Sequence, residues 1–276
     1  MDQNISLSIY QEMFYNLKKD INYIKKIPKK LQSEEMINLV LDYDFNMFKY
    51  IKNKTPSACL RVLKNNGEYI KYIDNPTVEM CEIAIKEAPY FIQHIKNPPL
   101  EIVEKVLKED GSCLQYIKNP TIDMCKLAVT ITPNALQYVL NQTEEICLMA
   151  VRKKGTALQY VKNQTFFITE TALQNNGLAI RFVQKPTDYL YQLAVKENGL
   201  ALKYIKDQTD EICMRAIKQN PNAFKYINKE LKESQKKAIK NVLSTLKRDK
   251  SYLFKITDYK LKKVVSDILK IVEQKI

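Results

Sequence analysis

Cysteine is the residue type whose chemistry and spacing first suggest a reactive site in this chain. Five of the six cysteines share one position of a 22-residue period: Cys59, Cys81, Cys125, Cys147 and Cys213. A thiolate can attack a substrate or bind zinc, but catalysis needs a neighbouring base and zinc needs further ligands. The one histidine, His94, has neither a second histidine nor a C-x-x-C motif beside it. The pattern therefore predicts no catalytic residue and no metal site.

A structural role explains the same cysteines. Free cysteine behaves as a small apolar side chain, so its recurrence at one position of a repeat is typical of a buried helix face. Equivalent residues on neighbouring helices lie about 8–10 Å apart, which is too far for a disulfide. We expect all six thiols to be free and buried, including that of Cys113, which lies outside the regular spacing.

The glycines and carboxylates also lack the arrangement of a cofactor site. All five glycines occupy one position of the period, so none belongs to a glycine-rich phosphate loop. The acidic residues that recur lie two residues after a threonine position, where they fit the first turn of a helix. The sequence therefore predicts a protein without a cofactor and without enzymatic activity.

The cysteine spacing is part of a repeat that runs through most of the chain. The phrase ALQYVLNQT at residues 135–143 returns as ALQYVKNQT at residues 157–165. Its ring residue recurs with the same 22-residue period and without insertion, at Tyr50, Tyr72, His94, Tyr116, Tyr138, Tyr160, Phe182, Tyr204 and Tyr226. A fixed period of about 20–50 residues is typical of a solenoid, in which each unit packs mainly against its neighbours.

Each unit is predicted to contain two helices. Threonine follows the ring by five residues in seven of the nine copies, as at Thr143, and is an expected N-cap. The next apolar residues, such as Ile146, Cys147, Ala150 and Val151, lie on one helical face. Glycine or proline comes four residues after the last of these, and we expect the glycines to end the helix in the left-handed conformation. A shorter second helix then leads into the next phrase.

The predicted fold is all-α. We expect a right-handed-type α-solenoid of about nine 22-residue two-helix repeats with helical N- and C-terminal caps. The caps are residues 1–48 and 229–276, the repeats are residues 49–228, and the three parts form one continuous domain.

Net charge raises the question of an acidic partner. The chain has a formal net charge of +13, and residues 229–276 contain 14 basic against 6 acidic residues. No run of 18 apolar residues is present, which predicts no membrane span. The opening segment MDQNISLSIYQEMFYNLKKD lacks the apolar stretch of a secretion signal, so we expect a cytoplasmic protein that is not secreted.

A basic row follows the second helices. It comprises Lys49, Lys52, Lys71, Lys96, Lys118, Lys162, Arg181, Lys203, Lys206 and Lys225, with Gln93, Gln115, Gln137 and Gln159 between them. Some helical-repeat proteins recognise RNA with two or three side chains per unit, and such a row could follow phosphates. The alternative is a set of solvated lysines favoured by the helix dipole.

An aromatic patch interrupts the pattern of units six and seven. Its residues are apolar where other copies are polar or acidic: Phe166, Phe167, Leu178, Tyr189 and Leu200. We expect Phe167 and Tyr189 to lie side by side where the first helices begin. Exposed aromatic residues are typical of protein interfaces. The alternatives are local repacking of the core and a contact with one of the caps.

The unit QTEEICLMAVRKKGTALQYVKN, residues 142–163, resembles short helical repeats of proteins from mimivirus-type giant viruses and some intracellular bacteria. The resemblance covers about residues 49–228 and rests on the Thr cap, the Ala-Val/Ile core pair, the Gly turn and the Leu-x-Tyr phrase. It implies a paired-helix solenoid and a viral protein of the host cytoplasm or virion, and it implies no activity.

The function predicted from these features is a non-catalytic scaffold for protein interaction. An unidentified protein is the expected partner, and the oligomeric state stays open. The alternative is a nucleic-acid-binding protein that uses the basic row and the basic C-terminal cap.

Overall fold

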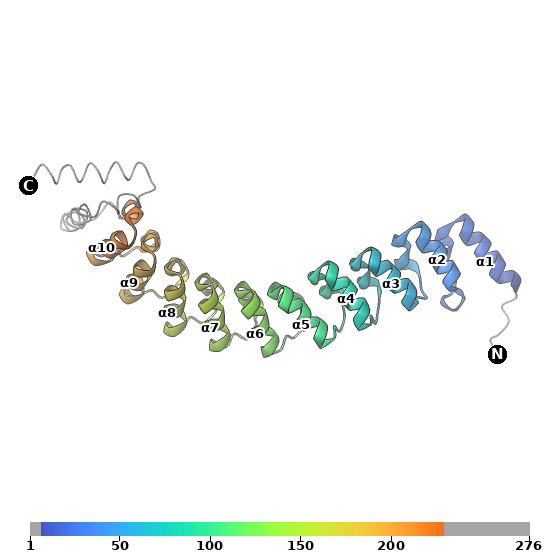
Figure 1. The fold of residues 1–276 in the computed structure, drawn as a ribbon, viewed down its shortest axis with the longest axis horizontal. Helices are drawn as coiled ribbons and strands as arrows, with labels where there is room; N and C mark the ends of the chain where they lie inside the picture. The colour runs from blue at the N-terminus through green and yellow to red at the C-terminus, as the bar shows by residue number, and fades with distance from the viewer. Residues whose placement is uncertain (1–6, 229–276) are drawn as a thin grey trace, which may run out of the picture. The chain divides into compact units, whose positions relative to one another are not determined.

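The computed structural model describes residues 7–228, all of whose regular elements are helical (Figure 1). The predicted C-terminal cap at residues 229–276, with its excess of basic charge, lies outside the described residues. The chain divides into two compact units, Met1–Leu127 and Ala128–Ile276, and each is described by itself.

The first compact unit alternates α-helices with short 3-10 helices. Its elements are α1 (Leu7–Lys19), η1 (Ile21–Lys25), η2 (Lys29–Leu31), α2 (Glu34–Tyr43), η3 (Phe45–Tyr50), α3 (Pro56–Asn65), η4 (Gly67–Tyr72), α4 (Val78–Glu87), η5 (Pro89–His94), α5 (Leu100–Glu109) and η6 (Gly111–Tyr116). Helix α6 (Ile122–Ile131) contains the division between the two units.

The second compact unit continues the alternation. Its elements are η7 (Pro133–Tyr138), α7 (Glu144–Lys153), η8 (Gly155–Tyr160), α8 (Phe166–Asn175), η9 (Gly177–Phe182), α9 (Asp188–Glu197), η10 (Gly199–Tyr204), α10 (Asp210–Gln219) and η11 (Pro221–Tyr226). Within each unit, successive α-helices other than α6 pack on one another, and successive 3-10 helices from η3 onward do the same. The predicted all-α fold, with paired helices in a 22-residue repeat, is therefore confirmed.

The α-helices begin and bury their faces as predicted. Thr143 accepts a hydrogen bond from the N–H of Ile146, and the other six threonines of this position cap their helices in the same way. Ile146, Cys147, Ala150 and Val151 are at most 3% exposed. The six cysteines are free and buried, so their predicted place in the core is confirmed.

The predicted left-handed glycine is wrong, because no glycine in the described part of the chain has a positive φ. The reason for glycine is close packing. A Cβ added at Gly177 would lie 2.2 Å from the carbonyl oxygen of Ala194, on the next α-helix. Asn176 before this glycine is the N-cap of the 3-10 helix, because its Oδ1 accepts from the N–H of Leu178 at 3.0 Å.

The predicted N-terminal cap contains one further pair of the same kind. Ser33 caps α2 by accepting from the N–H of Met36, and Asp44 caps η3 by accepting from the N–H of Asn46. Asp20 caps η1 in the same manner, but it lies two residues farther from Asp44 than the period requires. The pair of α2 and η3 itself keeps the period, because Ser33 and Asp44 lie 22 residues before Thr55 and Asn66; it was not predicted because Pro28 occupies the position of the ring residue.

Glutamine side chains join successive pairs, each made of one α-helix and the 3-10 helix that follows it, through hydrogen bonds to backbone groups. Gln164 Nε2 donates to the carbonyl oxygen of Leu158 at 3.3 Å and to that of Phe182 at 2.9 Å. Its Oε1 accepts from the N–H of Gln184 at 3.0 Å. Related arrangements occur at Gln32, Gln142 and Gln208. We call these four residues the glutamine clamps.

Among the described helices, none is both long and apolar enough to cross a lipid bilayer.

Candidate interaction surfaces

Three residues of the predicted aromatic patch are exposed at the start of two successive α-helices. Phe166 and Phe167 are the first two residues of α8, and Tyr189 is the second residue of α9. Their exposed fractions are 57%, 50% and 52%. They therefore lie outside the core, where the apolar face of each α-helix is buried. We call these three residues the aromatic cluster.

The pair of rings in contact differs from the expected one. The centroids of Phe166 and Tyr189 are 5.8 Å apart with an interplanar angle of 34°, whereas Phe167 was expected beside Tyr189. The sequence separation of Phe166 and Tyr189 is the same as that of other partners on successive α-helices, including Lys105 with Glu82 at 2.8 Å. Side chains in contact on neighbouring α-helices are therefore 23 residues apart, one more than the 22-residue period. This difference places Phe166, instead of Phe167, beside Tyr189.

The Tyr189 hydroxyl is held by the neighbouring helix. It donates a hydrogen bond to Oε1 of Glu170, which raises the pKa of Tyr189 above its ordinary value. The hydrogen bond and the ring contact together fix the orientation of an exposed tyrosine. An aromatic side chain that is already ordered loses little conformational entropy when a partner covers it.

The two leucines of the predicted patch lie elsewhere on the same pairs. Leu178 and Leu200 are the second residues of η9 and η10, and both are half-buried. They follow the C-terminal ends of α8 and α9, whereas the aromatic cluster lies at the N-terminal ends. Ten helical residues span about 15 Å, so the leucines are separate from the cluster.

Further exposed apolar residues, which were not predicted, lie near the beginnings of α-helices in each unit. In the second unit Leu140, in the loop before α7, is 75% exposed. In the first unit Val78, Leu100 and Ile122 are exposed at the first positions of α4, α5 and α6. The signal was present in the sequence, because the residue after the Thr position is apolar in several successive copies.

A groove of about 450 Å³ separates the beginnings of α7 and α8. Its lining includes Leu140, Glu144, Cys147, Lys162, Thr165 and Ile168. The wall is mixed, because apolar side chains line it together with a hydrogen bond of 3.0 Å from Thr165 Oγ1 to Glu144 Oε1. Thr165 is the N-cap of α8, so the groove adjoins the first turn that bears two rings of the aromatic cluster.

The predicted basic row separates into two groups and three further lysines. Lys52 and Lys162 bind backbone carbonyl oxygens of the preceding pair, and Lys162 Nζ lies 2.9 Å from the oxygen of Leu140. These two lysines support the fold. The other group lies at the next-to-last residue of the 3-10 helices: Lys49, Lys71, Arg181, Lys203 and Lys225. Lys96, Lys118 and Lys206 are exposed after the 3-10 helices.

In the second unit, the cations of this group alternate with aromatic rings. Arg181 Cζ is 4.4 Å from the ring centroid of Phe182 and 5.8 Å from that of Tyr204. Lys203 Nζ is 5.7 Å from the centroid of Tyr204 and 5.9 Å from that of Tyr226. Lys225 Nζ is 5.2 Å from the same Tyr226 ring. We call these six residues the cation–ring row.

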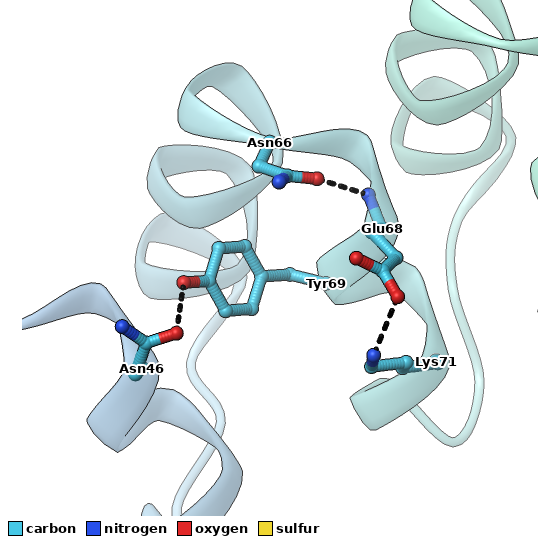
Figure 2. Close-up of polar contacts among 5 residues, drawn as sticks. All are labelled: Asn46, Asn66, Glu68, Tyr69 and Lys71. Carbon is cyan, nitrogen blue, oxygen red and sulfur yellow. Dashed lines mark hydrogen bonds and ion pairs between the residues drawn. The ribbon is translucent and has the colours of Figure 1, made fainter.

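In the first unit, the corresponding cation Lys71 has a carboxylate beside it. Figure 2 shows Lys71 paired with Glu68 at 2.7 Å and the Tyr69 hydroxyl donating to Asn46 Oδ1 at 3.2 Å. The side chains surround a polar hollow of about 100 Å³ that Lys49 also lines. The Lys71 ammonium lowers the pKa of Glu68, and Glu68 raises the pKa of Lys71.

Two of the equivalents of Glu68 in the second unit are apolar. Its repeat position is occupied by Leu178 and Leu200, three residues before the cations Arg181 and Lys203. Within residues 7–228 neither Arg181 nor Lys203 has an ion pair. Arg181 and Lys203 therefore present positive charge without an ion pair within residues 7–228, whereas Lys71 of the first unit is paired with Glu68.

The thiols are poor candidates for chemistry. Burial raises the pKa of Cys81, Cys113 and Cys213 to about 11, so these thiols are protonated at neutral pH. No group of three or more His, Cys, Asp or Glu side chains suited to a metal ion occurs among the described residues. His94 is half-buried, with its ring centroid 6.3 Å from that of Phe91.

One family model matches part of the second unit. Residues 191–232 match a domain of unknown function, DUF4116. No curated protein and no solved structure matches the chain. The DUF4116 domain includes Lys203, Tyr204, Lys225 and Tyr226 of the cation–ring row. It begins two residues after Tyr189, so the aromatic cluster lies outside it.

Proposed function

We propose that the chain is a non-catalytic scaffold that binds another protein at the aromatic cluster. The observation that supports this most directly is the exposure of Phe166, Phe167 and Tyr189 on two successive helices, each side chain being at least 50% exposed. Burying a large aromatic side chain stabilises an interface by about 1.5–3 kcal/mol, and such residues are frequent among interface residues of high energetic weight.

The arrangement of the cluster favours a protein over a small molecule. The rings lie on the edge formed by the first helical turns, next to a groove of about 450 Å³ with a mixed polar and apolar wall. Leu140, which also lines that groove, extends the apolar surface to a third pair. A protein segment can cover the groove and the rings together, whereas a small ligand would leave most of this surface in water.

A matched set of variants tests this proposal. Phe167→Glu combined with Tyr189→Glu removes two rings and adds charge to the cluster. The control combines Tyr15→Glu with Tyr43→Glu, because both tyrosines are exposed, by 58% and 72%, and belong to α1 and α2. The readout is quantitative affinity capture with the full chain as bait, together with thermal unfolding followed by circular dichroism.

The proposal predicts a protein that is recovered with wild type and with the control, and that is lost with the cluster variant. All three baits should unfold at similar temperatures, because exposed side chains are replaced. Equal recovery by all three baits contradicts the proposal. A cluster variant that unfolds well below the control would assign the rings to the fold instead of to a partner.

The cellular setting follows from the resemblance to giant-virus repeat proteins. We infer on that basis that the chain acts as a viral scaffold in host cytoplasm or in the virion. Detection of the protein in purified virions or in the cytosolic fraction of infected cells supports this inference, and recovery from the culture medium alone contradicts it.

A further inference from the structure

We propose that the cation–ring row binds single-stranded nucleic acid, independently of the partner at the aromatic cluster. The row is formed by the last two residues of three successive 3-10 helices, η9, η10 and η11, which pack side by side in the second unit. Each helix thus adds one cation and one ring to the same surface.

The contacts within the row make it continuous. Arg181 lies against the ring of its own helix and against the ring of the next, and Lys203 does the same one helix later. All five distances from cation to centroid are below about 6 Å, the range of an attractive cation–ring contact. The rings therefore orient the cations, and the cations remain exposed at the surface.

The charge of the row favours a polyanion. Arg181 and Lys203 have no ion pair among the described residues, and Leu178 and Leu200 replace the carboxylate that compensates Lys71 in the first unit. A phosphate group that approaches these two cations can pair with them and release its counterions. It does not have to displace a carboxylate from them first. Such a surface suits a chain of phosphates better than it suits an isolated anion.

The rings favour a single strand over a duplex. Surfaces that bind single-stranded nucleic acid combine a positive path for the backbone with aromatic side chains on which bases stack. Tyr204, the ring in the middle of the row, is 36% exposed, and Phe182 and Tyr226 are half-buried. A duplex keeps its bases stacked inside, so it can use the cations of the row but not the rings.

Fluorescence anisotropy with the full chain and labelled single- and double-stranded oligonucleotides, from about 50 to 200 mM salt, tests the proposal. The row variant combines Arg181→Gln with Lys203→Gln. The control combines Lys196→Gln with Lys218→Gln, which removes the same charge from the last turns of α9 and α10. A second pair of variants, Tyr204→Leu and Tyr204→Phe, tests whether binding requires the aromatic ring or only an apolar side chain of similar size.

We expect wild type and control to bind the single strand with a steep dependence on salt. The row variant should bind about tenfold more weakly, and its salt slope should be smaller by about 1.4, since each phosphate contact to a single strand contributes about 0.7. Tyr204→Leu should weaken binding, and Tyr204→Phe should retain it.

The proposal is overturned by absence of binding at the lowest salt concentration, by equal losses in row variant and control, or by equal affinity for duplex. None of these results bears on the aromatic cluster, which is unchanged in every variant.

Discussion

Replacing Gln164 by alanine should loosen the junction between two successive pairs while leaving the α-helices formed. The side chain makes three hydrogen bonds to the backbone: with the carbonyl oxygens of Leu158 and Phe182, and with the N–H of Gln184. These groups belong to two 3-10 helices and the loop that follows, and the methyl group of alanine can replace none of the three bonds.

The expected cost follows from those bonds. A hydrogen bond within a protein contributes about 0.5–1.5 kcal/mol net, and buried groups left without a partner cost more. Gln164 is half-buried, so water can reach part of the vacated site. We therefore expect Gln164→Ala to lower the free energy of unfolding by about 2 kcal/mol. Gln164→Glu should cost more, because a carboxylate oxygen would face two carbonyl oxygens.

Urea denaturation followed by circular dichroism measures this effect, and hydrogen exchange at the Gln184 amide locates it. Gln159→Ala is the matched control, since Gln159 is exposed and makes one local bond, from Nε2 to the carbonyl oxygen of Thr156 at 3.1 Å. Its expected cost is below about 0.5 kcal/mol. Equal costs for the two alanine variants, or a Gln164→Glu variant as stable as Gln164→Ala, would refute the role of the clamp.

Two further predictions concern packing and pH. Gly177→Ala should destabilise the chain by about 1–3 kcal/mol in thermal unfolding, because the new Cβ would lie 2.2 Å from the Ala194 carbonyl oxygen; Gly67→Ala, whose nearest contact is 3.0 Å, should cost less, and the reverse order would contradict the packing explanation. The thiols of Cys81, Cys113 and Cys213 have a pKa raised by burial from 9.0 to about 11. Their burial therefore stabilises the fold fully below pH 9 and loses this effect as the pH rises through 11. The urea midpoint should fall between about pH 8 and pH 10.5, with a smaller fall in Cys213→Ala, and an unchanged fall would contradict the assignment.

The regular part of the fold was predictable because local rules and the period agree. Threonine at one position caps every helix in which it occurs, and the apolar residues that follow it recur with helical spacing. The glycines were misinterpreted, because glycine after a helix has two distinct causes: a left-handed residue and a close approach of backbone. The sequence does not distinguish these two causes, whereas the short distance from Gly177 to the next α-helix does.

The surfaces were predictable in composition but not in arrangement. The sequence identified Phe166, Phe167 and Tyr189, yet the contact between Phe166 and Tyr189 depends on an offset of one residue between neighbouring helices. The glutamine clamps gave no signal, because other copies have proline at the same position, as at Pro186. The pairing of Arg181 with two rings depends on how the 3-10 helices pack, which a period does not specify.

Site-specific photo-crosslinking from the aromatic cluster tests the proposed function most directly. A photoreactive phenylalanine analogue replaces Phe167 in the full chain, and the same analogue at Tyr43 is the control. The account predicts one discrete adduct with a different protein from position 167 and none from position 43. An adduct between two copies of this chain, or equal adducts from both positions, would contradict it.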